Sequence, residues 1–246
     1  MNAPLARTFL RLFAVQGSWN YDRMLGLGMG VAAEPLLRDL HGGDHGDAYR
    51  AAVARSARFF NAHPYLAGLA VGAAARAEHD GAAPAQIERL RTALIGPLGS
   101  LGDRLVWAGW LPFVASAAMA AWALGAGWLA VAAFLLVYNA GHVALRWWAL
   151  REGWALGAKV GSALHSPVLQ RATAWAIPAM ALMTGFALPL VAHTLAGPFT
   201  GWERGALAAV AVAGFLMLQW FRGALDGLRL GLAFVALALV AGWLWP

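Results

Sequence analysis

The chain has 246 residues, of which 61% are hydrophobic and only 12% are charged, whereas a soluble domain usually has about 25% charged residues. It contains no cysteine, which excludes a disulfide framework, a thiolate metal site and a cysteine nucleophile. The net charge of +6 rests on arginine with a single lysine. Because no basic run or RNA-binding signature accompanies it, we expect topogenic arginines and no nucleic-acid partner.

The charges divide the chain into two parts. Positions 1–104 carry 20 charged residues, and positions 105–246 carry 10. We therefore expect an all-α, polytopic integral membrane protein. Its first part, 1–104, would hold amphipathic and re-entrant helices, and its second part, 105–246, would hold about five transmembrane helices.

The N-terminal segment has the pattern of an amphipathic helix. Arg7 and Arg11 lie one turn apart, and Leu5, Phe9 and Leu12 fall on the opposite face. Such a helix can lie along the bilayer surface or pack against the rest of the protein, and the sequence leaves both alternatives open. The two arginines interrupt the apolar stretch, so it is not a signal peptide.

Two short apolar runs follow, Met24–Ala33 and Pro64–Ala75, and both contain glycines. Each is too short to span a bilayer and suits a re-entrant or interfacial segment. Glycine-broken segments in membrane proteins point to a substrate site. The alternative is a soluble helical bundle with glycine-rich turns.

Two polar clusters flank these runs. The first contains Gln16 and Asn20, whose amides can donate to and accept from sugar hydroxyls, although they could also cap a helix. The second reads FFNAHPY at 59–65. Pro64 restricts His63 to extended backbone, so Asn61 and His63 are expected at a helix N-terminus, where free N–H groups can hold a polar ligand. The ordinary alternative is a structural histidine.

Two further clusters lie at or inside the apolar part. Residues 95–104 hold three glycines and a proline, which predicts an irregular loop ending at Asp103, either in the site or as a helix cap. Their spacing does not match a Walker loop. Asn139 and His142 lie inside or near the end of the second span, and polar side chains at membrane depth are costly and tend to be functional. They are candidates for a polar site in the membrane. The alternative is that Arg146 marks the interface and that both residues lie only one or two turns below it.

The apolar stretches predict five spans, since about 20 apolar residues cross a bilayer: 105–124, 128–145, 173–197, 205–221 and 228–245. A tight turn at 125–127 joins the first two. Arginines concentrate in the loops 146–171 and 222–229, whereas the connection 198–204 carries only Arg204. The positive-inside rule then places the N-terminus in the cytoplasm.

The order and spacing of the four clusters resemble the enzyme IID subunits of the mannose/fructose/sorbose class of the bacterial phosphotransferase system. The stretches that carry the resemblance are QGSWNYDRM, FFNAHPY, IGPLGSLGD and YNAGHVALRWWALREGWALG. It runs from about residue 7 to residue 160, and the remainder matches only in hydropathy.

The resemblance implies a multi-pass subunit of the bacterial inner membrane that forms the sugar-translocating unit with a IIC subunit. A separate IIAB protein would supply the phosphoryl group as a hexose-type sugar enters. IID itself is not phosphorylated in this family, so the chain would need no cofactor and would not be an enzyme alone. The sugar-binding residues would be Gln16, Asn20, Asn61, His63 and Asp103.

The chain departs from the family pattern at two informative positions. Ala62 stands where the family usually has threonine, and His142 stands where it has arginine. The second change removes a permanent charge. These departures favour an alternative function as a membrane scaffold or regulator that kept the fold and lost transport. A membrane enzyme with a catalytic histidine is a weaker alternative, since no span carries paired carboxylates or metal-ligand spacing.

Overall fold

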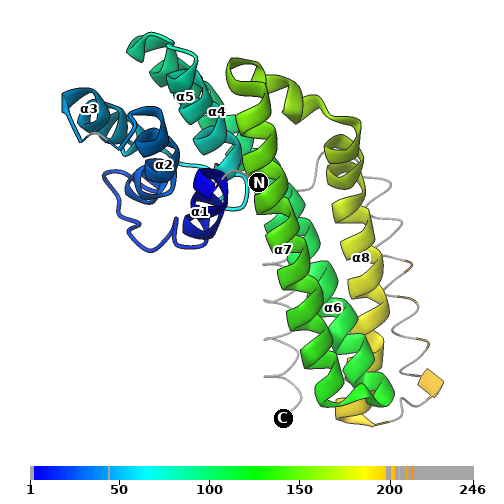
Figure 1. Ribbon diagram of the computed structural model, residues 1–246. Coiled ribbons are helices and arrows are strands. Elements are labelled where there is room, and N and C mark those ends of the chain that lie inside the picture. The colour runs from blue at the N-terminus through cyan, green and yellow to red at the C-terminus, as the bar shows by residue number, and fades with distance from the viewer. Residues whose placement is uncertain are drawn as a thin grey trace. The chain divides into compact units, whose positions relative to one another are not determined.

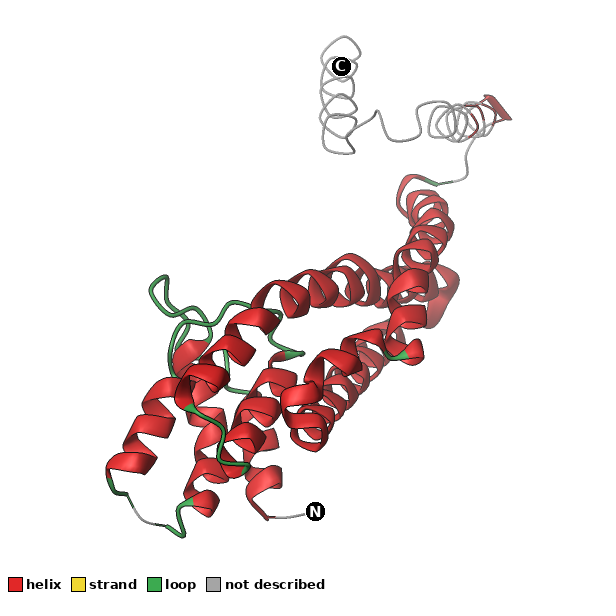
Figure 2. Cartoon of the chain, turned by 90° about the horizontal axis from the view of Figure 1, so that it is seen from above, coloured by secondary structure: helices red, strands yellow, loops and turns green. Residues whose placement is uncertain are grey.

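The computed structural model describes residues 3–43 and 45–197, together with residues 201, 202, 205, 209 and 212. In this described part the secondary structure is helical, and no strand is formed beyond isolated backbone bridges at Met24 (Figure 2). The contacts divide the chain into Met1–Val191 and Ala192–Pro246. The first unit holds almost all of the described helices, and the account below concerns that unit.

Five helices precede the long apolar ones: α1 (Ala3–Leu12), α2 (Gly26–Leu40), α3 (Asp47–Ser56), α4 (Ala67–His79) and α5 (Pro84–Gly102). The chain then continues through the π-helical η1 (Asp103–Trp110), α6 (Leu111–Ala121), the π-helical η2 (Trp122–Ala126), α7 (Trp128–Leu156), the 3-10 helix η3 (Gly157–His165) and α8 (Pro167–Ala196). Figure 1 shows α6 and α7 extending away from the end where α1 to α5 gather.

Three helices in the described part are long and apolar enough to cross a membrane: Pro84–Ala126, Trp128–His165 and Pro167–Leu195. They contain the predicted spans 105–124 and 128–145 and most of 173–197, which agrees with the predicted all-α membrane fold. The predicted spans 205–221 and 228–245 lie outside the described residues, apart from Gly205, Ala209 and Val212. The predicted division at residue 104 stays a prediction, and its boundary falls where α5 runs directly into η1.

The N-terminal helix packs against the protein. Leu12 and Thr8 are fully buried, and α1 contacts α2, α4 and α7. On its polar side Arg11 pairs with Glu34 of α2, which also accepts a hydrogen bond of 2.9 Å from the Tyr49 hydroxyl of α3. Burial alone would raise the pKa of Glu34, but hydrogen bonds from Tyr49 and Arg11 and the nearby arginine charges lower it below its ordinary value. Glu34 therefore joins the first three helices.

The glycines of α4 serve helix packing. A Cβ at Gly72 would lie 2.6 Å from the backbone nitrogen of Trp154, and a Cβ at Gly153 of α7 would lie 2.3 Å from the carbonyl oxygen of Leu69. Only small residues allow two helix backbones to approach this closely. The short run Pro64–Ala75 thus begins with a turn and from Ala67 on belongs to the continuous helix α4, whose glycine face meets α7. A re-entrant placement of α2 and α4 in the bilayer stays a prediction.

The irregular loop predicted at 95–104 is wrong. These residues complete α5 and begin η1. The helix forms because Ile87, Leu94 and Leu98 recur on one face and are all buried. Burial of this stripe outweighs the intrinsic cost of glycine in a helix, which is about 1 kcal/mol per residue relative to alanine.

The loop predicted at 146–171 is also wrong for most of its length. Helix α7 continues to Leu156 and η3 follows to His165, so Arg146 lies inside a helix and is only 3% exposed. Arg151, Lys159 and Arg171 are exposed. By contrast, the tight turn predicted at 125–127 is confirmed, because Gly125 and Gly127 have φ of 98° and 55°, which glycine adopts without steric cost.

We expect Gly153→Ala to lower the stability of the protein by about 1–3 kcal/mol, because its Cβ would force α4 and α7 apart. The measurement is the thermal unfolding midpoint of the purified protein in mild detergent. Gly161→Ala is the matched control, since a Cβ there meets no atom within 4 Å. Equal midpoints for the two variants would contradict this account of the packing.

Candidate functional site

The four polar clusters of the sequence converge on the segment that connects α3 with α4. The backbone N–H of Leu25 donates to the Phe60 carbonyl oxygen at 2.9 Å, and the N–H of Phe60 donates to the Arg23 carbonyl oxygen at 3.2 Å. These bonds pair the end of the first cluster with the start of the second. The result is a backbone frame that fixes where Asn61 and His63 lie.

The third cluster meets the second at Gly102. A Cβ at this position would lie 2.1 Å from the His63 Cβ, so His63 packs directly on the backbone of α5. The next turn of the chain is the π-helical η1, and π-helical turns are often found at functional sites. Trp107 of η1 places its ring 5.0 Å from the His63 ring.

The fourth cluster meets the second through Tyr65. Its ring stacks on the His142 ring of α7, with centroids 4.4 Å apart and planes 13° apart. Its hydroxyl lies 2.7 Å from the Tyr138 hydroxyl, one turn earlier on α7. Tyr65 therefore connects the turn before α4 to the polar face of α7.

Arg146 lies one turn beyond His142 and holds these parts together. Its Nη1 donates to the carbonyl oxygens of Leu12 and Pro64. Its guanidinium carbon lies 4.7 Å from the centroid of the Tyr65 ring and 5.4 Å from that of Phe13. One buried cation thus joins the end of α1, the turn before α4 and the middle of α7.

Arg91 of α5 also joins separate elements through backbone carbonyl oxygens, in this case at the end of α3. Its guanidinium donates to the carbonyl oxygens of Arg55, Ser56 and Arg58, and it lies over the Phe60 ring at 5.6 Å. The last carbonyls of a helix have no partner within the helix. Arg91 satisfies them and fixes the start of the connecting segment.

His63 is a buried, neutral group. It is 1% exposed, and the backbone N–H of Tyr65 donates to its Nδ1 at 3.2 Å. Nδ1 is therefore the acceptor, so the proton resides on Nε2, which has no partner in the described part of the chain. Burial, and secondly the Arg146 charge, lower the pKa of His63 to about 4.

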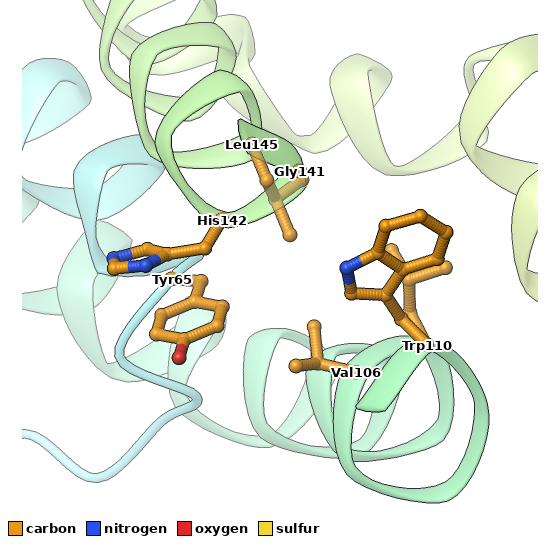
Figure 3. Close-up of a pocket in the computed structure, with 7 residues that line it drawn as sticks. Tyr65, Val106, Trp110, Gly141, His142 and Leu145 are labelled. Carbon is orange, nitrogen blue, oxygen red and sulfur yellow. The ribbon is translucent and has the colours of Figure 1, made fainter. Parts of the chain in front are cut away.

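A cavity of about 210 Å³ adjoins Tyr65. Figure 3 shows Tyr65 and His142 on one side of it and Trp110 on the other, with Val106 below and Gly141 and Leu145 above. The lining is aromatic and aliphatic, and the residues that form it are Tyr65, Leu105, Val106, Trp110, Gly141, His142 and Leu145.

The residues predicted to bind sugar occupy different environments. Gln16, Asn61 and Asp103 are exposed, and Asn20 uses its amide within its own turn, accepting from the Arg23 N–H and donating to the Ser18 carbonyl. His63 is buried behind Tyr65. None of these five lines the cavity, and the sugar-binding assignment stays a prediction.

The two polar residues of α7 that were predicted to form a site, Asn139 and His142, also lie in different environments. His142 lines the cavity, whereas Asn139 is exposed and its amide nitrogen donates to the Leu135 carbonyl oxygen at 2.7 Å. Sequence reasoning missed Arg146, Tyr65 and Trp110. The available signal was helical spacing, because Tyr138, His142 and Arg146 recur every fourth residue on one helix face.

Comparison with known proteins agrees with the family resemblance that the order of the four clusters indicated. The family model described as PTS system mannose/fructose/sorbose family IID component matches residues 2–245. The chain belongs to this IID family.

Among the described residues, no group of three histidine, aspartate or glutamate side chains could hold a metal ion.

Two relatives show the degree of similarity. The mannose-specific EIID component of Escherichia coli K12 is 30% identical over 170 residues, which cover 67% of this chain and 59% of that protein. The sorbose-specific EIID component of Klebsiella pneumoniae is 32% identical over 174 residues, covering 69% and 62%. The matched region thus spans about three fifths of the length of these relatives.

Solved structures share the fold. A cryo-EM structure of the mannose transporter ManYZ in complex with microcin E492 contains a chain with a TM-score of 0.59 and 21% identity, and the match covers 99% of this IID chain and 96% of that chain. A second membrane protein gives a TM-score of 0.70 at 22% identity with the same coverage.

We expect Arg146→Met to lower stability by about 3 kcal/mol, because two buried carbonyl oxygens would lose a charged donor. Thermal unfolding in mild detergent measures the effect. Arg151→Met is the matched control, since Arg151 lies on the same helix but is exposed. If both variants unfold at the same temperature, Arg146 does not hold the three elements together.

The low pKa of His63 predicts acid sensitivity. In the unfolded chain a histidine binds its proton near pH 6.5, whereas folded His63 binds it at about 4. Between these values the unfolded state binds more protons, so stability falls as pH decreases from about 6.5 to 4. We expect His63→Gln to flatten this part of the stability profile and His165→Gln, at an exposed site, to leave it unchanged. A profile in His63→Gln as steep as in the natural chain would refute the assignment.

Proposed function

We propose that this chain is the IID subunit of a mannose-class sugar permease. It forms the translocating unit with a IIC subunit in a hetero-oligomer, and a IIAB protein phosphorylates a hexose-type sugar on entry. The observation that carries the proposal is the family match over residues 2–245. The convergence of the four clusters on one segment supports it.

The chain contributes a polar surface to the translocating unit. Asn61 and Asp103 are exposed, and Asn61 belongs to the loop that packs on α5 just before Asp103. A hydroxyl-rich sugar needs several donors and acceptors at once. The exposed amide and carboxylate supply some of these, and the partner subunit supplies the rest.

His63 acts as a structural support in this proposal. Its burial keeps it out of reach of a phosphoryl donor, and its low pKa keeps it neutral, so it fixes the shape of the loop that presents Asn61. This agrees with a subunit that is not itself phosphorylated. The phosphoryl group then passes from IIAB to the sugar without a covalent intermediate on this chain.

The proposed location is the bacterial inner membrane with the N-terminus in the cytoplasm. With Arg146 left out because it is buried, the stretch from the last turns of α7 to the first turns of α8 still presents the exposed cations Arg151, Lys159 and Arg171. Cations in short connections favour the cytoplasmic side. A protease-accessible tag at the N-terminus of the chain in oriented vesicles tests this orientation.

The first test of the function is purification of the tagged chain from native membranes in mild detergent, followed by mass spectrometry of the proteins that accompany it. We expect a second polytopic subunit and a histidine phosphocarrier. Vesicles containing these partners are then expected to phosphorylate sugar with phosphoenolpyruvate as the donor.

A membrane scaffold or regulator is the second candidate, and His142 favours it. In place of the family's arginine, the His142 ring stacks on the ring of Tyr65. The scaffold predicts partner binding without phosphoenolpyruvate-dependent phosphorylation in the same vesicles. Recovery of the chain alone, or with unrelated partners, would count against the permease.

We expect Asn61→Ala to lower sugar uptake about tenfold, the effect of losing one hydrogen bond to a substrate. Gln170→Ala is the matched control, because this exposed amide lies outside the four clusters. Both variants should reach the membrane in equal amounts, as judged by immunoblotting. Unchanged uptake in Asn61→Ala would remove Asn61 from the sugar site.

A further inference from the structure

Large apolar side chains are exposed on α1, on α2 and on the connection between these two helices. We call them the N-terminal apolar strip, and its members are Leu10, Phe13, Trp19, Tyr21, Leu27 and Val31. Single exposed apolar residues are ordinary on a protein surface, whereas a continuous group of them marks an interaction site.

Backbone contacts show that the parts of the strip on the two helices are continuous. The Nη1 of Arg11, which follows Leu10, donates to the carbonyl oxygen of Val31 at 3.0 Å. A Cβ at Gly28 would lie 2.0 Å from the carbonyl oxygen of Val15, so the start of α2 packs on the backbone just after α1. The exposed residues of both helices therefore form one surface.

Both helices change from apolar to charged along their exposed faces. On α1, exposed Arg7 lies one turn before Leu10, and on α2, exposed Arg38 lies two turns after Val31. In each helix the apolar end is the end that meets the connection between them. This pattern indicates that a boundary between water and an apolar medium crosses both helices.

Contacts with α7 place this boundary at the surface of the membrane. Trp128 and Trp147 are 19 positions apart on α7, about 29 Å along a helix, and the hydrocarbon core is about 30 Å thick. The Phe9 ring lies 5.2 Å from the Trp147 ring, and the Phe13 ring lies 5.4 Å from the His142 ring. The end of α1 therefore meets α7 where its membrane-crossing stretch ends.

The connection between α1 and α2 lies on the same side. Figure 1 shows it below α1 to α3, on the side toward which α6 and α7 extend. It carries Trp19 and Tyr21, whose ring centroids are 4.9 Å apart, and exposed Arg23. Such side chains favour the head-group level, because their apolar part is buried while their polar end stays wet. Asp22 is the only acidic residue of positions 3–33, which also hold three arginines.

We infer that the N-terminal apolar strip lies in the head-group region of the leaflet at which α7 ends, where anionic phospholipid covers it. Leu10 contacts acyl chains, and Arg7 and Arg23 meet lipid phosphates. Lipid is favoured over a protein partner because the strip continues the surface of a membrane-crossing helix. The bond from Arg146 to the Leu12 carbonyl oxygen keeps α1 at this level. The inference does not depend on sugar transport.

The natural chain has no cysteine, so each single-cysteine variant carries one nitroxide label. Leu10→Cys and Val31→Cys report on the strip, and both positions are exposed, so the substitutions leave the core intact. Leu136→Cys, 73% exposed within the span of α7, is the lipid reference, and Asp47→Cys, exposed on α3, is the water reference. Electron paramagnetic resonance measures collisions with oxygen and with a nickel chelate in vesicles of phosphatidylethanolamine and phosphatidylglycerol.

We expect both strip labels to favour oxygen over nickel, at a depth of about 5–10 Å in the boundary between head groups and acyl chains. The Asp47→Cys label should remain in water. Replacing phosphatidylglycerol by phosphatidylcholine should reduce the depth of the Leu10→Cys label, and so should Arg7→Gln combined with Arg23→Gln. Arg50→Gln is the matched control, because Arg50 is exposed on α3, and it should leave the depth unchanged.

Two results would overturn the inference. The first is nickel contact at Leu10→Cys and Val31→Cys as strong as at Asp47→Cys, in vesicles where the Leu136→Cys label lies in lipid. If a IIC subunit then shields the strip labels from both reagents, the strip is a protein interface. The second is a depth that changes neither with phosphatidylglycerol nor with the two arginines, which would remove anionic lipid as the occupant.

Discussion

The arrangement of this protein depends on one buried cation. Arg146 lies within an apolar helix, where a charge without partners is prohibitively costly. Its guanidinium can remain there only because two carbonyl oxygens and two aromatic rings come to it from distant parts of the chain. Those partners belong to the end of α1 and the turn before α4. The need to satisfy this side chain therefore fixes the position of Pro64 and, next to it, Tyr65.

Close backbone contacts extend this constraint to the remaining elements. Gly72 and Gly153 bring α4 against α7, and Gly102 admits the His63 ring against α5. A side chain at any of these positions would separate the elements that Arg146 draws together. Glycine in the polar clusters thus acts through packing, and the same packing gives His63 its burial and its lowered pKa. Local sequence features that suggest loops or ligand sites are, in three dimensions, contact surfaces between helices.

The resulting site has two chemically different sides. Exposed amide and carboxylate groups at Asn61 and Asp103 face outward, which suits a polar site completed by a partner in a IID family member. The cavity beside Tyr65 is lined by aromatic and aliphatic side chains together with His142. Tyr65 stands between the two sides, since it follows the loop that presents Asn61 and also stacks on His142.

The sequence by itself determined the membrane class, the first three apolar spans and the tight turn between α6 and α7, because hydropathy over 20 residues and glycine at positive φ are local properties. The order of the four motif clusters along the chain also identified the IID family. Only the tertiary structure decided that residues 95–104 are helical, that Arg146 is buried and that Asn20 is used within its own turn. These outcomes depend on partners supplied from far along the chain, and a linear pattern does not reveal which carbonyl oxygen or aromatic ring will be near a given side chain. The sequence alone does not distinguish an arginine that is exposed in a loop from one that is buried. Arg146 is of the second kind, because it donates to the carbonyl oxygens of Leu12 and Pro64 inside the fold.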